Sequence, residues 1–152
     1  MKPIVTGRKI VKSFRTGAET RTILNQVSLE IAKGEFVSVM GPSGSGKSTL
    51  LYALGGLDEI DGGQVLFEGQ NLTELSDRQR SDLRRTRMGF VFQQPALLKN
   101  LNLLDNIILP LMRDHPGEAD QLAGRANMLM EHLGIGDLAS RDITQVSGGQ
   151  LQ

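Results

Sequence analysis

The chain has 152 residues, which is enough for one domain with a substantial core. Its 17 Lys and Arg residues balance 17 Asp and Glu residues, so no overall field favours nucleic acid or an anionic membrane surface. The absence of cysteine excludes disulfides and thiolate metal sites. No apolar run approaches the length of a transmembrane helix, and no signal-peptide core follows Met1, so we expect a cytoplasmic protein.

The first forty residues alternate between apolar stretches and polar turns. Residues 10–14 are a candidate strand, and residues 16–22 form a polar, hairpin-like connection. Apolar and polar residues alternate over 27–31, which predicts a half-buried strand that ends at the turn 33–34. The apolar run 35–40 follows, and we expect it to be a short buried strand.

Residues 41–48, Gly-Pro-Ser-Gly-Ser-Gly-Lys-Ser, fit the phosphate-loop pattern G-x-x-x-x-G-K-[ST]. A helix predicted over 48–54 and stopped by two glycines follows them. The free N–H groups of such a loop and of the first helical turn converge on one point, which suits polyphosphate. Lys47 would reach the β- and γ-phosphates, and the Ser48 hydroxyl would ligate Mg²⁺. The predicted nucleotide-binding residues are Gly41, Pro42, Ser43, Gly44, Ser45, Gly46, Lys47, Ser48 and Thr49.

The remaining predicted elements change from mixed to helical along the chain. They are a turn at 61–63, a strand at 64–69, a helix at 76–87, a strand at 89–92, and helices at 103–110 and 119–133. Ser76 and Gln79 form a capping-box pattern at the start of the arginine-rich helix. Aspartates interleave with its arginines, which favours a solvated face over nucleic-acid binding. We therefore predict an α/β nucleotide-binding core over about residues 1–95 and a helical subdomain over about 96–152.

The run Ser147-Gly148-Gly149-Gln150, about a hundred residues after the phosphate loop, resembles the LSGGQ signature of ABC-transporter ATPases. Phe14, the phosphate loop, Gln93 and this run match the A-loop aromatic, Walker A, Q-loop and signature motifs in the order of the family. Three shorter segments, 56–58, 89–93 and 109–110, are similar to the subgroup of lipoprotein-release, macrolide-export and antimicrobial-peptide-export ATPases.

The resemblance implies a role for each matched residue. Phe14 would stack on adenine, although a core aromatic at the end of a strand is the alternative. Gln93 would ligate Mg²⁺, take part in catalysis with Lys47 and report the γ-phosphate between the two lobes, unless it is an ordinary loop amide. Ser147, Gly148, Gly149 and Gln150 would contact ATP held by a second ATP-binding subunit.

The sequence also departs from the family pattern. Val146 stands where the signature usually has leucine. In the family the Walker B strand with its aspartate and catalytic glutamate, the D-loop and the switch histidine all follow the signature, and we find no substitute for them before it. We therefore expect the chain to be the N-terminal part of a longer ATPase, inactive alone, and the helix that supports the signature loop to be missing.

The resemblance as a whole implies a P-loop NTPase core with a peripheral antiparallel β-sheet and a helical subdomain, an incomplete ABC ATPase fold. It implies an ATP- and Mg²⁺-dependent subunit that drives export through an integral-membrane permease at the cytoplasmic face of the plasma membrane, with no nucleic-acid partner. Two alternatives remain open: a non-hydrolysing nucleotide-binding remnant, and a soluble ABC ATPase of DNA repair or translation. The transported substrate is not indicated.

Overall fold

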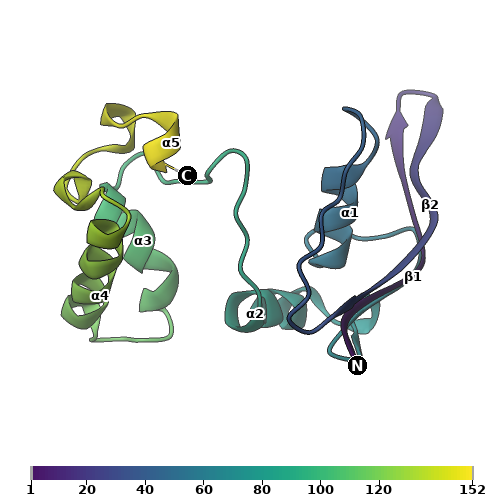
Figure 1. Ribbon diagram of the computed structural model, residues 1–152, viewed down its shortest axis with the longest axis horizontal. Coiled ribbons are helices and arrows are strands. Elements are labelled where there is room, and N and C mark those ends of the chain that lie inside the picture. The colour runs from purple at the N-terminus through teal and green to yellow at the C-terminus, as the bar shows by residue number, and fades with distance from the viewer. Residues whose placement is uncertain (1, 152) are drawn as a thin grey trace. The chain divides into compact units, whose positions relative to one another are not determined.

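A computed structural model describes residues 2–151 of the chain (Figure 1). The chain divides into two compact units, residues 1–89 and residues 90–152. The first unit combines a sheet with two α-helices, and the second is built from helices and connecting loops. Among residues 2–151, no helix has both the length and the apolar composition that crossing a bilayer requires.

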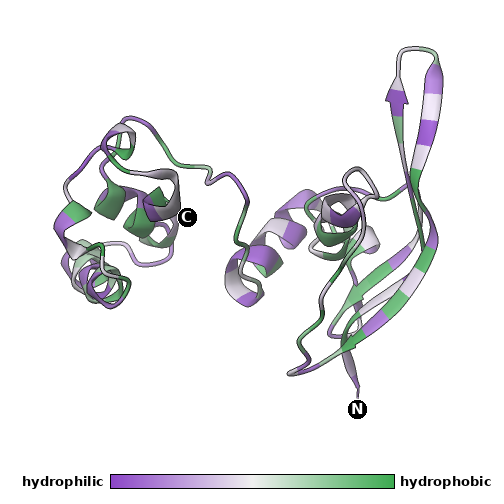
Figure 2. Ribbon diagram, turned by 45° about the horizontal axis from the view of Figure 1, so that its top comes forward, coloured by the Kyte–Doolittle hydropathy of each residue, from purple (hydrophilic) through white to green (hydrophobic). Residues whose placement is uncertain are grey.

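A four-stranded antiparallel sheet, in the order β2-β1-β3-β4, forms the scaffold of the first unit. The long strands β1 (Pro3–Thr16) and β2 (Glu19–Ala32) make a hairpin, and β3 (Gly62–Phe67) and β4 (Gln70–Asn71) extend the sheet beyond β1. The strands predicted over 10–14 and 27–31 are confirmed, although each is only part of a longer strand. Figure 2 shows that the tip of the hairpin is hydrophilic and that hydrophobic residues gather in its lower part.

Helix α1 (Lys47–Leu54) packs on this sheet and closes the core of the first unit. Its buried residues, Ala53 and Leu54, lie at its C-terminal end. Its N-terminal end follows the predicted phosphate loop, residues 41–48, which we call the glycine loop. The helix ends before Gly55, as predicted. The buried side chains of the core come from β1, β2, α1 and β3 and from the segment after β4: Ile10, Leu24, Ala53, Leu54, Val65, Phe67 and Leu72.

Helix α2 (Asp77–Arg87) follows the short 3₁₀ turn η1 (Leu72–Glu74). The predicted capping box is confirmed: the Gln79 N–H donates to Ser76 Oγ at 3.4 Å, and the Ser76 N–H donates to Gln79 Oε1 at 2.9 Å. Helix α2 buries no residue completely, but its Leu83 packs against the core. The cap therefore fixes where this mostly exposed helix begins.

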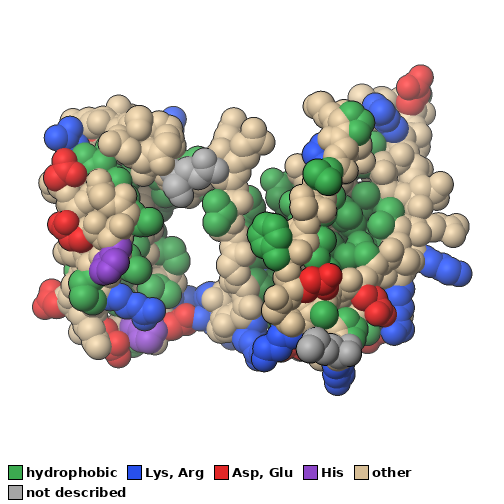
Figure 3. All heavy atoms as spheres, in the orientation of Figure 1, with side chains coloured by type: hydrophobic (Ala, Val, Ile, Leu, Met, Phe, Trp, Pro, Cys, Tyr) green, Lys and Arg blue, Asp and Glu red, His purple; other side chains and the backbone are tan. Residues whose placement is uncertain are grey.

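Two predicted strands are absent from the described structure. Residues 35–40 and 89–92 have the apolar composition of strands, but neither segment forms a strand. Phe36 is 96% exposed and Met40 is 86% exposed, so the expected burial of the first segment is wrong. The physical reason is that a strand needs a hydrogen-bonded neighbour, and no described residue pairs with either segment in a ladder. Figure 3 shows hydrophobic side chains at the surface of the first unit.

The second unit is helical, and the helices predicted over 103–110 and 119–133 are both present in it. It contains α3 (Leu103–Met112), α4 (Ala119–His132), the 3₁₀ turns η2 (Gly136–Leu138) and η3 (Ile143–Gln145), and α5 (Gly148–Leu151). Two buried clusters hold it together. The first joins Leu103, Met130 and Leu138, and the second joins Ile108, Leu122 and Ala126.

A single amide connects the start of the second unit to α3. Asn106 Oδ1 accepts the Leu98 N–H at 2.7 Å, and its Nδ2 donates to the carbonyls of Leu98, Leu101 and Asn102. Asn102 caps α3 by accepting the Asp105 N–H at 2.7 Å. These bonds satisfy backbone groups that would otherwise lack partners in the loop before α3.

Candidate functional site

The glycine loop before α1 adopts a conformation that other residues resist. Gly44 and Gly46 have positive φ angles of 76° and 91°, and Gly46 is the N-cap of α1 in a left-handed conformation. A Cβ on Gly46 would lie 2.8 Å from Ile23 Cγ2 and 3.4 Å from the Ile23 carbonyl oxygen. Strand β2 therefore approaches the loop so closely that only glycine fits there.

Lys47 is the first residue of α1, and its side chain turns back over the loop. Its Nζ donates to the carbonyl oxygens of Gly41 at 3.0 Å and Pro42 at 2.8 Å. The Ser45 N–H donates to the Pro42 carbonyl at 3.3 Å, which closes the loop on itself. The ammonium group is thus held at the centre of the loop, with no carboxylate among these bonds.

The N-terminus of α1 is electrostatically suited to an anion. The helix has no side-chain N-cap bond and no acidic residue in its first turn. The first backbone N–H that bonds back along the helix is that of Leu50, which donates to the Gly46 carbonyl at 2.8 Å. The preceding N–H groups and the helix dipole therefore favour negative charge at this end. Ser48 is exposed and Thr49 half-buried, so the Ser48 hydroxyl is accessible to a ligand.

A pocket of about 310 Å³ lies beside the loop. Residues of β2, of the segment before the loop, of the loop and of α1 line it: Ile23, Leu24, Val27, Val39, Met40, Gly41, Pro42, Ser45, Gly46, Lys47 and Leu50. Most of this lining is apolar. An apolar wall lowers the local dielectric, which strengthens the interaction of Lys47 with a charged ligand.

Phe14 lies in the same unit as the loop, near the tip of the β1–β2 hairpin. It pairs with Arg21 of β2, two residues along that strand from Ile23, and its side chain is 44% exposed. Figure 1 shows the hairpin tip and the loop above α1 at the same end of the unit. The alternative of a core aromatic is therefore not supported, because the Phe14 side chain is too exposed to belong to the core.

Gln93 and the signature residues belong to the second unit. Gln93 is exposed in a segment without helix or strand, next to the stacked rings of Phe90 and Phe92, whose centroids are 5.9 Å apart. Gln94 is exposed as well. Their exposure leaves the Gln93 side chain accessible, as a ligand-binding amide requires.

The signature residues form the start of a helix. Ser147 and the three residues that follow it are exposed, and α5 begins at Gly148. The Ser147 N–H donates to Gln150 Oε1 at 2.8 Å, and the Gln150 N–H donates to the Ser147 carbonyl at 3.0 Å. Val146 packs against the cluster around Met130. The expectation that the helix supporting the signature loop is missing is wrong, because α5 begins at Gly148 within the signature.

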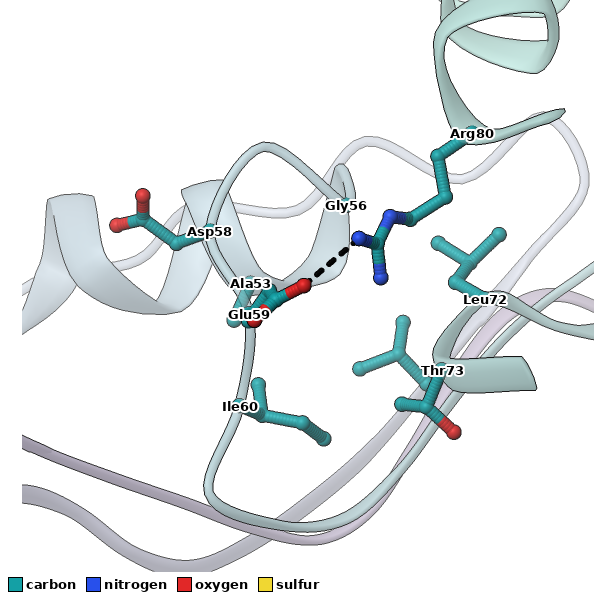
Figure 4. Close-up of a pocket in the computed structure, with 9 residues that line it drawn as sticks. Ala53, Gly56, Asp58, Glu59, Ile60, Leu72, Thr73 and Arg80 are labelled. Carbon is teal, nitrogen blue, oxygen red and sulfur yellow. Dashed lines mark hydrogen bonds and ion pairs between the residues drawn. The ribbon is translucent and has the colours of Figure 1, made fainter. Parts of the chain in front are cut away.

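A second pocket, of about 220 Å³, was not indicated by the sequence (Figure 4). The side chain of Arg80 from α2, only 15% exposed, reaches the Glu59 carboxylate at 2.8 Å and also bonds to Asp77. These hydrogen bonds, first to Asp77 and then to Glu59, raise the pKa of Arg80. Arg84 donates to the Gly56 carbonyl oxygen. Two arginines of the expected solvated face therefore tie α2 to the loop after α1.

Comparison with known proteins identifies the family of this chain. The sequence profile of the ABC transporter family matches residues 24–152, which includes the glycine loop, Gln93 and the signature. The chain belongs to the ABC transporter family. Its described structure has the α/β fold of ABC ATPase cassettes, in which an antiparallel sheet and helices accompany the phosphate loop.

Individual relatives fall in the subgroup that the short segments indicated. The chain is 44% identical over 151 residues to the lipoprotein-releasing system ATP-binding protein LolD of Roseobacter denitrificans, covering 99% of this chain and 66% of that protein. It is 39% identical over 149 residues to the macrolide export ATP-binding/permease protein MacB of Aggregatibacter actinomycetemcomitans, covering 98% of this chain and 23% of that protein. The chain thus spans about two thirds of the length of the relative LolD.

The solved structure of the ATP-binding cassette MJ0796, a dimer in a post-hydrolysis state bound to ADP and phosphate, superposes with a TM-score of 0.90. It is 37% identical in sequence, and the superposition covers 97% of this chain and 65% of the cassette. The fold predicted from the motifs is therefore confirmed.

Proposed function

We propose that this chain provides the ATP-binding part of an ABC exporter. The observation that carries the proposal is the glycine loop itself, in which the Lys47 ammonium lies against two loop carbonyls at the uncapped N-terminus of α1. When ATP binds, the Lys47 ammonium group would donate its hydrogen bonds to the β- and γ-phosphates instead of to the two carbonyls, since phosphate oxygens are stronger acceptors than neutral carbonyls.

The remaining site residues have complementary roles in the proposal. The Ser48 hydroxyl would be a ligand of Mg²⁺, which neutralises phosphate charge when it is bound. The exposed side-chain oxygen of Gln93, in the second unit, is a ligand of the same chemical type. The exposed ring of Phe14 would stack on adenine. Backbone groups of residues 41–49 would bind the phosphates. Each of these groups is of the chemical type that the ligand needs, and no acidic residue stands in the first turn of α1 to repel it.

Coupling to transport requires partners outside this chain. Ser147, Gly148, Gly149 and Gln150 would contact ATP bound by a second subunit, and closure of the two subunits around ATP would drive an integral-membrane permease at the cytoplasmic face of the membrane. The dimeric form of the cassette MJ0796, the lipoprotein release in the name of LolD and the macrolide export and permease in the name of MacB support this assignment. Hydrolysis would also need a group that orients the attacking water.

The proposal is tested by titrating the chain with ATP and Mg²⁺ in a calorimeter. Replacing Lys47 with alanine removes a charge-assisted contact, so ATP should bind about 10- to 100-fold more weakly. The matched control is Lys33→Ala, which removes the same charge from an exposed turn after β2. Equal ATP affinity in Lys47→Ala and the unmodified chain, or an equal loss in Lys33→Ala, would contradict the assigned role of the loop.

A further inference from the structure

Lys12 lies over the aromatic ring that the proposed function assigns to adenine. Its Nζ is 5.3 Å from the centroid of the Phe14 ring. Lys12 and Phe14 are two residues apart on β1, and the pairing of β1 with β2 shifts register between Lys12 and Ser13. At this distance the ammonium is attracted by the electron-rich ring face. One face of the ring is therefore already occupied by a cation.

The ammonium of Lys12 is held in place by a second contact. It donates to the Glu59 carbonyl oxygen at 2.5 Å, and this residue lies in the turn between α1 and β3. The same turn makes two further hydrogen bonds to β1: the Ser13 N–H donates to Asp61 Oδ2 at 2.6 Å, and the Asp61 N–H donates to the Val11 carbonyl at 2.8 Å. Lys12 is therefore anchored to a turn that is itself bonded to the strand.

A residue of α2, Arg80, also holds this turn in place. The Glu59 carboxylate accepts a bond from Arg80 at 2.8 Å, as Figure 4 shows, while its backbone carbonyl accepts the bond from Lys12. A continuous set of contacts thus runs from Arg80 through Glu59 and Lys12 to the Phe14 ring. Without these contacts a side chain as exposed as Phe14 would sample several rotamers.

The ring also lies at a suitable place relative to the loop. Strand β2 touches the loop where Ile23 meets Gly46, and Phe14 pairs with Arg21 two residues further toward the hairpin tip. Two residues of a chain span at most about 7 Å. A nucleotide whose phosphates bind the loop can therefore extend along β2 toward Phe14.

We propose that Lys12 is a positioning residue for the nucleotide base. It orders the Phe14 ring, covers one of its faces and leaves the other face to the purine, so part of the ordering cost is removed before the ligand binds. The proposal rests on the proposed function, because it needs a nucleotide in the glycine loop. It assigns binding of the base and binding of the phosphates to different residues: Lys12 acts on the base through Phe14, whereas Lys47 acts on the phosphates.

The experiment compares ATP with inorganic tripolyphosphate, which has the phosphates but no base. Replacing Lys12 with methionine keeps an unbranched side chain and removes the charge, so ATP should bind about two- to fivefold more weakly while tripolyphosphate affinity stays unchanged. Lys12→Arg should restore ATP affinity, because a guanidinium also binds an aromatic face. Arg15→Met, which removes a charge next to Phe14, is the matched control.

A double-mutant cycle tests whether Lys12 acts through the ring. In a Phe14→Leu background, Lys12→Met should cause no further loss of ATP affinity. Four results would overturn the inference: unchanged ATP affinity in Lys12→Met, an equal loss for tripolyphosphate, an equal loss of ATP affinity in Arg15→Met, or a loss of ATP affinity that persists without the ring. Failure of the unmodified chain to bind ATP would overturn the proposed function as well, so the two failures are distinguishable.

Discussion

Replacing Gly46 with alanine should destabilise the first unit more than the same change at Gly44. Both residues have positive φ angles, which cost about 1–2 kcal/mol for a residue with a Cβ. The lower entropy of the unfolded alanine variant offsets about 0.4–1 kcal/mol of this. Nothing lies within 4 Å of a Cβ on Gly44, so that variant should lose roughly 1 kcal/mol.

Gly46 carries an additional steric cost. Its new Cβ would lie 2.8 Å from Ile23 Cγ2, a separation that forces either β2 or the loop to move. Overpacking of this kind costs about 1–3 kcal/mol, so the total loss for Gly46→Ala should be roughly 2–4 kcal/mol. The same change in an Ile23→Ala background should cost less, because the clashing methyl is absent.

The sole tyrosine of the chain provides the assay. Tyr52 lies in α1, and the chain has no tryptophan, so its fluorescence during urea unfolding reports on the first unit. The free energies of unfolding of the Gly44 and Gly46 variants are compared directly. If Gly46→Ala is no less stable than Gly44→Ala, the close approach of β2 to the loop is wrong.

Two further predictions concern segments outside the loop. Ser76→Ala removes the N-cap of α2 and should cost about 1 kcal/mol in the Tyr52-monitored unfolding, whereas Ser76→Asp should retain most of the stability; an alanine variant as stable as the parent would refute the cap. Replacing Phe36 and Met40 together with serine should raise the concentration at which the chain self-associates in light scattering, because both side chains are almost fully exposed. The unfolding midpoint should change little, and a large drop would mean that these side chains are buried.

The features predictable from sequence were those with short-range causes. The glycine loop, the helix after it and the capping box of Ser76 and Gln79 each depend on residues within a few positions of one another, and the structure confirms all three. The helices over 103–110 and 119–133 also follow from local apolar periodicity. In these cases the sequence contains both partners of each interaction in one short window.

Contacts between distant segments were not predictable in the same way. The approach of Ile23 to Gly46, the bond from Lys12 to Glu59 and the ion pair of Arg80 join residues 21 to 47 positions apart. Aspartates interleave with arginines along α2, and this pattern predicted an exposed face on which neighbouring charges pair within the helix. It contained no sign of the contact between Arg80 and Glu59, because Glu59 lies in the turn after α1 and reaches Arg80 only in the folded chain.

The segment 35–40 shows why an apolar run identifies a need for burial but not the partner that meets it. Its composition is that of a buried strand, yet a strand is defined by hydrogen bonds to a neighbouring strand, whatever the distance between the two in the sequence. Among residues 2–151 no such neighbour pairs with it, and Phe36 and Met40 are exposed. The loop that follows nevertheless keeps its closed form, because Lys47 and Ser45 bond to its own carbonyls. In the described structure the phosphate loop is therefore held by local bonds and by its contact with β2, without strand pairing of the segment before it.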